Sequence, residues 1–174
     1  MGHTLVMRFD KNGNQKLREL MSPFNANKIP FGRNCDREAA DAVMDYHLTM
    51  FHWPKTQDEY YLECIKNFEP VPCKILITGT RVMLAEEGSY LLYFEASPDQ
   101  GYWDMAKRIE EKVNAKTSGF LHITLAVSKD AKEIETINNH ICRNVTFPFR
   151  LDVEGLDLYH IWTPTAKVRS FCAL

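Results

Sequence analysis

The sequence has few of the features that are typical of secreted, membrane-bound or disulfide-stabilised proteins. Its cysteines are odd in number, five in 174 residues, and no two of them are spaced as Cys-x-x-Cys. This set argues against a disulfide framework or a thiolate zinc site and indicates reduced thiols. No apolar run approaches the roughly 20 residues of a membrane span, and the run Leu5-Val6-Met7 is too short for a signal peptide. We therefore expect a soluble, cytoplasmic protein without a membrane partner.

The charge balance also lacks an excess of one sign. Lys and Arg number 21 and Asp and Glu number 23, which gives a formal net charge of -2. A globally basic surface for nucleic acid is therefore absent, although a local patch remains open. A chain of this length can bury roughly 70% of its unfolded surface, so it needs no disulfide or metal site to stabilise its fold. No coiled-coil heptads are present, so we expect a monomer with no obligatory protein partner.

One five-residue pattern occurs twice in the chain. Tyr46-His-Leu-Thr-Met50 and Leu121-His-Ile-Thr-Leu125 both follow the pattern apolar, His, apolar, Thr, apolar. Side chains alternate between the two faces of a strand, so His and Thr share one face in each copy. The same alternation extends the first face to Phe51 and Trp53, which could stack a base or pack between lobes. It places His52 on the opposite face.

The two copies occupy equivalent places in a repeated order of elements. Periodicity and Gly/Pro positions predict strand, helix, His strand, helix and strand in residues 4–84, and a similar order, ending in further strands, in residues 89–173. The predicted fold is α+β, one domain over residues 1–174 with two pseudo-symmetric lobes. Each lobe is expected to be an antiparallel sheet with helices on its outer face, and the His strands are expected to face a central cleft. Strands are predicted at 4–9, 45–53, 73–84, 89–96, 120–128, 146–151, 155–162 and 167–173, and helices at 15–21, 35–44, 56–68, 97–113 and 130–142.

The segments His47-Leu-Thr49-Met50 and His122-Ile-Thr124-Leu125 resemble the paired motifs of the two-histidine phosphoesterases. This family comprises the 2′-5′ RNA ligase-like and cyclic phosphodiesterase proteins, and the likeness in element order extends from Thr4 to about Phe171. The resemblance implies a two-lobed fold with the motifs flanking a water-filled cleft. It also implies chemistry without metal or cofactor on 2′,3′-cyclic or 2′-5′-linked phosphates, with a small nucleotide or an RNA terminus as the substrate.

Two histidines and two threonines suit displacement at phosphorus. An unperturbed imidazole pKa of about 6.5 lets one ring accept a proton while the other donates one. The hydroxyls of Thr49 and Thr124 would donate hydrogen bonds to the non-bridging phosphate oxygens. His47 and His122 are thus the catalytic candidates, and Thr49 and Thr124 the phosphate-binding candidates. The pattern does not say which histidine is the acid.

Several other residues are candidates to line the site. Arg33, on the loop that leads to the first motif, is the preferred phosphate contact, and Tyr159 and Trp162 could line the cleft, although core packing explains them more simply. A zinc site from His47 and His52 is disfavoured, because strand alternation separates the two side chains; no metal is expected. Three further arginines could contact phosphate: Arg81, Arg150 and Arg169.

Two other functions use the same residues. A nucleotide- or RNA-binding module on this fold would need the groove but would show little or no turnover. A structural protein would bury the two histidines in separate cores. A binding module needs no matched acid and base, so the intact His and Thr in both motifs favour a phosphoesterase.

Overall fold

The computed structural model describes residues 2–24, 46–54, 58–85, 88–113, 116–160 and 163–172. The helix predicted at 35–44 lies outside these residues. The strands are β1 (Gly2–Phe9), β2 (His47–Pro54), β3 (Cys73–Leu84), β4 (Tyr90–Pro98), β5 (His122–Ser128), β6 (Phe149–His160) and β7 (Thr163–Cys172). The helices are α1 (Lys11–Met21), the short 3₁₀ helix η1 (Ser22–Phe24), α2 (Asp58–Ile65), α3 (Gln100–Val113) and α4 (Ala131–Asn144).

The seven strands form one sheet in the order β2-β1-β6-β3-β4-β5, with β7 paired to β6. Every strand pair is antiparallel. Exchanging β1, β2 and β3 for β4, β5 and β6 turns this order into its own reverse, as a pseudo-two-fold axis requires. The predicted α+β class and pseudo-symmetric antiparallel arrangement are therefore confirmed.

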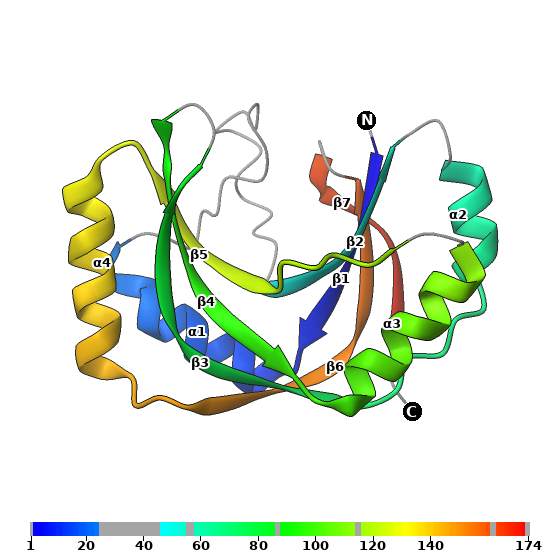
Figure 1. Ribbon diagram of the computed structural model, residues 1–174, viewed down its shortest axis with the longest axis horizontal. Helices are drawn as coiled ribbons and strands as arrows, with labels where there is room; N and C mark the ends of the chain where they lie inside the picture. Colours follow the sequence, from blue (N-terminus) through cyan, green and yellow to red (C-terminus); the bar gives the residue numbers. More distant parts are fainter. Residues whose placement is uncertain are drawn as a thin grey trace.

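The two lobes are not the two halves of the chain. β3, from the half-repeat 4–84, pairs with β4, whereas β6, from the half-repeat 89–173, pairs with β1. Each half therefore gives its third strand to the opposite lobe. The helices are exchanged in the same way, since α1 lies beside α4 and α2 beside α3 (Figure 1). Because β6 pairs with both β1 and β3, the lobes share one continuous sheet.

The hydrophobic core lies between the sheet and the helices. Alternate residues of β1, Leu5, Met7 and Phe9, are buried on this side. Figure 1 shows all four α-helices on the outside of a U-shaped sheet, and we call the opposite, concave side the inner face. None of the described helices is long and apolar enough to cross a membrane. The helices bury residues three or four apart, such as Met105, Ile109 and Val113 of α3 and Ile134, Ile137 and Ile141 of α4.

Several element boundaries differ from the predicted ones; for example, Ser97 and Pro98, predicted to begin a helix, end strand β4. Two other differences have a visible cause. Residues 10–14 look like a turn in the sequence, but α1 already begins at Lys11. The Asp10 carboxylate caps this helix by accepting a hydrogen bond from the Gly13 N–H at 2.7 Å, and a Cβ at Gly13 would lie only 2.8 Å from that carboxylate. The strands predicted at 146–151 and 155–162 are one strand, β6, with a bulge at Glu154.

Candidate active site

The first motif lies on β2, where pairing with β1 determines the direction of its side chains. Arg8 pairs with His47 and Val6 with Thr49. Directly opposed residues of antiparallel strands point to the same face, and Val6 and Arg8 alternate with the core residues of β1. His47 and Thr49 therefore lie on the inner face, where both are half-buried, while Leu48 between them is fully buried in the core.

The second motif has the same arrangement on β5. Glu95 of β4 pairs with His122 and Tyr93 pairs with Thr124. His122 and Thr124 are half-buried on the inner face, and the intervening Ile123 is fully buried. Strand alternation thus predicts the direction of His and Thr correctly within each motif.

A β-bulge follows the threonine in both motifs. The register of β1 with β2 skips Met50, and the register of β4 with β5 skips Leu125. A bulge sets two residues of one strand against one of its partner and thereby reverses the alternation beyond it. Each bulge is consequently followed by a second core residue, Phe51 in β2 and Ala126 in β5.

The first bulge corrects two predictions made from simple alternation. Phe51, predicted on the inner face, is 2% exposed and packs in the core edge-on against Tyr61, with ring centroids 5.8 Å apart. His52, predicted to face the core, pairs with Thr4 and is exposed on the inner face. The sequence does contain a signal for the bulge, because the adjacent apolar residues Met50 and Phe51 interrupt the alternation.

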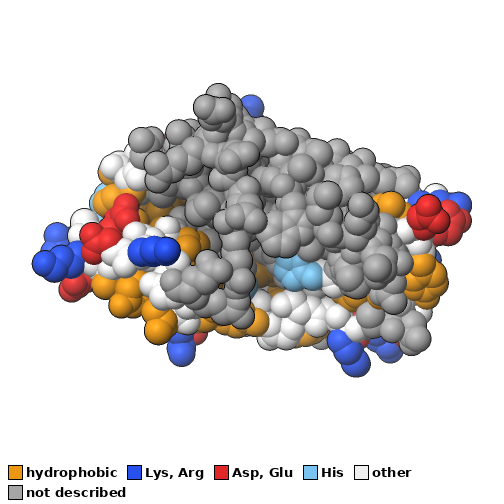
Figure 2. All heavy atoms as spheres, turned by 90° about the horizontal axis from the view of Figure 1, so that it is seen from above, with side chains coloured by type: hydrophobic (Ala, Val, Ile, Leu, Met, Phe, Trp, Pro, Cys, Tyr) orange, Lys and Arg blue, Asp and Glu red, His pale blue; other side chains and the backbone are white. Residues whose placement is uncertain are grey.

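The two motif strands stand at opposite ends of the pairing order, but they contact each other and meet near the middle of the U, above β3 and β6 in Figure 1. The carbonyl of the bulge residue Met50 accepts a hydrogen bond from the Ser118 N–H, shortly before β5, at 2.9 Å. Burial and, after it, the charge of His122 lower the pKa of both His47 and His52, so the charge of one imidazole acts on the others. Histidine surface is visible near the middle of the inner face in Figure 2.

His122 is held in one orientation by its neighbours. Its Nδ1 lies 3.1 Å from the carbonyl oxygen of Phe120, whose ring also stacks on the imidazole with centroids 4.2 Å apart and 26° between planes. The ring of Tyr93 meets the imidazole edge-on at 5.5 Å. A carbonyl oxygen only accepts, so Nδ1 carries the proton and Nε2 is left for proton transfer. Burial lowers the pKa of His122, and the hydrogen bond to Phe120 opposes this shift.

His47 is driven more strongly to its neutral form. Burial, followed by the charges of His122 and His52, lowers the pKa of His47 to about 3, although Asp157 opposes the shift. Asp157 is 2% exposed and accepts a hydrogen bond from Nη1 of Arg8 at 3.0 Å. Since Arg8 pairs directly with His47, this buried ion pair lies beside the imidazole.

The remaining predicted site residues are only partly described. Arg33 and Trp162 lie outside the described residues, and of Trp53 and Tyr159 only the backbone is described, paired with His3 and Thr4 respectively. Among the other arginines, Arg81 forms an ion pair with Glu95 at 2.6 Å, Arg150 is exposed near the outer cavity, and Arg169 pairs in the sheet with Leu158.

No group of three His, Cys, Asp or Glu residues within the described ranges is arranged to hold a metal ion, even though His47, His52 and His122 share a face.

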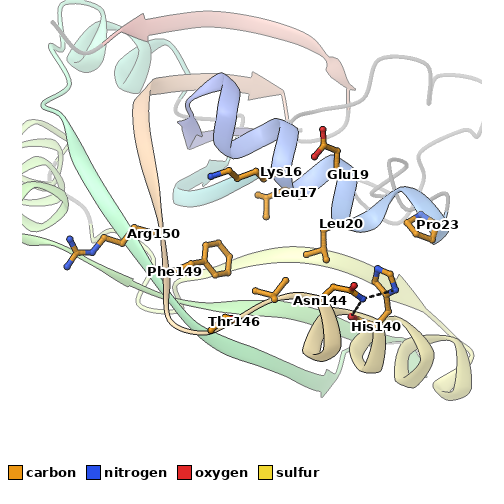
Figure 3. A pocket seen from close by; sticks show the side chains of 11 residues that line it. Lys16, Leu17, Glu19, Leu20, Pro23, His140, Asn144, Thr146, Phe149 and Arg150 are labelled. Atoms are coloured by element: carbon orange, nitrogen blue, oxygen red, sulfur yellow. Dashed lines mark hydrogen bonds between the residues drawn. The ribbon is translucent and has the colours of Figure 1, made fainter.

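A cavity of about 570 Å³ opens between α1 and α4, on the outer side of the sheet. Figure 3 shows Leu17 and Leu20 at this cavity, with Asn144 donating a hydrogen bond to the His140 carbonyl. It contains no residue of either motif, so the candidate site is the inner face instead.

The inner face therefore offers two imidazoles and two hydroxyls from neighbouring strands. A neutral imidazole can accept a proton, an imidazolium can donate one, and a threonine hydroxyl can donate to an oxygen that gains charge. Sequence alternation found these groups, but it missed Arg8, Asp157 and His52. The first two come from strands far from the motif in the chain, and the third depends on the bulge.

Solved structures with the same fold are similar over nearly the whole chain. TT0787 of Thermus thermophilus is 18% identical, with a TM-score of 0.55 over 99% of this chain and 97% of that one. LigT of E. coli, complexed with ATP, is 15% identical, with a TM-score of 0.52 over 99% and 97%. Usb1 of Kluyveromyces marxianus is 12% identical, with a TM-score of 0.51 over 98% and 96%.

These proteins are members of the two-histidine phosphoesterase superfamily, so the fold implied by the paired motifs is confirmed. No protein-family model and no curated protein sequence matches the chain.

Proposed function

We propose that the protein is a phosphodiesterase that needs no metal and acts on a 2′,3′-cyclic or 2′-5′ phosphodiester of a nucleotide or RNA terminus. The observation that carries this proposal is the pair of His-x-Thr motifs, which lie on neighbouring strands and present the same groups to one face. Residues 1–174 would act as one two-lobed monomeric domain in the cytoplasm.

In this reaction one of the two rings, His47 or His122, acts as the base and the other as the acid. A neutral imidazole takes a proton from the attacking water, whose oxygen forms a new bond to phosphorus. The other ring, as imidazolium, gives its proton to the ribose oxygen as the phosphorus–oxygen bond to that oxygen breaks. Thr49 and Thr124 donate hydrogen bonds to the non-bridging oxygens, where negative charge must be stabilised.

The lowered pKa values fit this division of labour. In the free protein both imidazoles are biased towards the neutral form. A bound phosphate diester adds a negative charge, which favours the protonated form of a nearby imidazole. Substrate binding would therefore supply the acid, and the ring that stays neutral would serve as the base.

The ligands of similar structures support a nucleotide substrate. Usb1 has been solved with uridine monophosphate, and LigT with 3′-AMP and with ATP. Each of these ligands carries a phosphate on a ribose. We infer that the inner face of this protein accepts the same chemical class.

The test is hydrolysis of 2′,3′-cyclic nucleotides and 2′-5′ oligonucleotides by the wild type in the presence of EDTA. Turnover that persists with the chelator supports the proposal, whereas a strict metal requirement contradicts it. The competing function is a nucleotide-binding module on the same fold. Saturable binding of these ligands, with no product after prolonged incubation, would favour that module.

A further inference from the structure

His52 lies on the inner face, but the acid–base step does not use it. Thr4 pairs with His52 and Arg8 pairs with His47, so the two histidines are separated by four residues of β1. At about 3.3 Å per residue this corresponds to roughly 13 Å along the strand. His52 is thus well placed for a group next to the scissile phosphate, further along β2.

The surroundings of His52 differ from those of His122. Its side chain is exposed, and among the described residues no hydrogen bond fixes the ring, in contrast to the bond between His122 and Phe120. Partial burial and the charge of His122 lower the pKa of His52. An anion that binds beside the exposed ring would favour its protonated form.

The pseudo-symmetric position in the other lobe is occupied by an apolar residue. Val127 follows the bulge at Leu125 as His52 follows the bulge at Met50, and Val127 is 36% exposed. The two positions are equivalent in the backbone, but only the one on β2 carries a hydrogen-bonding group. Of these two equivalent positions, a ligand that extends from the motifs thus meets a hydrogen-bonding side chain at His52 and an apolar one at Val127.

We propose that His52 is a substrate-binding residue that holds a second phosphate, next to the scissile one. An imidazolium donates charge-assisted hydrogen bonds to a non-bridging phosphate oxygen. The preferred substrate is then a nucleotide end whose ribose carries phosphate on both sides, such as an oligonucleotide with a 2′,3′-cyclic end, rather than a free cyclic nucleoside monophosphate. This proposal rests on the proposed function and specifies its substrate.

The first experiment compares adenosine 2′,3′-cyclic phosphate with the same compound carrying a 5′-phosphate. We expect the wild type to prefer the 5′-phosphorylated substrate by about tenfold in kcat/KM, which is typical of one charge-assisted hydrogen bond. His52→Ala should reduce this ratio towards one, chiefly through KM. The matched control, Val127→Ala at the equivalent position, should retain the ratio.

The second experiment measures binding without turnover, by calorimetry with 3′-AMP and adenosine 3′,5′-bisphosphate. The bisphosphate should bind the wild type about tenfold more tightly, and His52→Ala should abolish the difference. Failure to hydrolyse either cyclic nucleotide would contradict the proposed function, while this measurement would still test His52. Equal affinities in the wild type, or an unchanged preference in His52→Ala, would overturn the role of His52.

Discussion

His47 and His122 occupy equivalent backbone positions in the two lobes, but the charged residues beside them have the opposite arrangement. In one lobe the residue across from His47 is Arg8, and its acidic partner Asp157 is on the next strand. In the other lobe the residue across from His122 is Glu95, and its basic partner Arg81 is on the next strand. The ion pair is therefore repeated with its polarity reversed.

The two ion pairs also differ in burial. The side chains of Arg8 and Asp157 are 16% and 3% exposed, whereas those of Arg81 and Glu95 are 66% and 37% exposed. A buried pair depends on both members, because either one alone would be a poorly solvated charge, whereas an exposed pair is screened by water. The symmetric backbone thus repeats the positions of the chemical groups, and burial makes them different.

The largest expected effect tests whether the two histidines act as one unit. His47→Ala and His122→Ala should each reduce kcat on a 2′,3′-cyclic nucleotide by roughly 10²–10⁴-fold, because each removes one proton-transfer group. The double variant should lose little more than either single variant, since groups that act together are not additive. Steady-state kinetics measures the loss of kcat, and circular dichroism of each variant is the control for folding. Near-full turnover by either single variant would contradict the role of that histidine.

The next effect concerns the buried ion pair. Asp157→Ala should lower the free energy of unfolding by up to roughly 3 kcal/mol, because it removes the closest and most buried carboxylate from the guanidinium of Arg8 and leaves it with the more exposed Glu154, 3.5 Å from Nε. Urea denaturation of the variant and the wild type measures the difference. A loss below about 1 kcal/mol would show that this pair behaves like a surface pair.

A smaller effect is the pH dependence of stability that arises from the protonation of His47. Because the pKa of folded His47 is lowered to about 3, the unfolded chain binds more protons between pH 6.5 and 3. Stability should therefore fall as the pH is lowered through this window, by up to about 1.4 kcal/mol per pH unit from this group. Urea denaturation at pH 7 and pH 5 should show a weaker pH dependence for His47→Asn than for the wild type. Equal pH dependence would indicate that His47 titrates normally.

The smallest effect belongs to the exposed ion pair. Glu95→Gln should change the free energy of unfolding by no more than about 1 kcal/mol, because water screens the attraction between Glu95 and Arg81. The same urea measurement compares this variant with Asp157→Ala. A loss as large as that of Asp157→Ala would show that the two ion pairs contribute equally to stability despite their different burial.

Local patterns predicted most of the elements and the orientation of the two motifs. Alternation within each five-residue pattern correctly places His47 and Thr49, and likewise His122 and Thr124, on one face. It fails one residue beyond each threonine, where a bulge reverses the parity, so the prediction for Phe51 is wrong. A bulge depends on pairing with the neighbouring strand, which alternation along a single strand does not include.

The sequence by itself determined the α+β class, the repeated order of elements and the identity of the paired His and Thr groups, because these follow from short-range periodicity. Only the tertiary structure decided that each half gives its third strand to the other lobe, and that His52 stands on the face of the two motif histidines. It also determined that Asp157 is buried whereas Glu95 is partly exposed. These features arise from contacts between residues far apart in the chain, and the local pattern around each residue does not encode them.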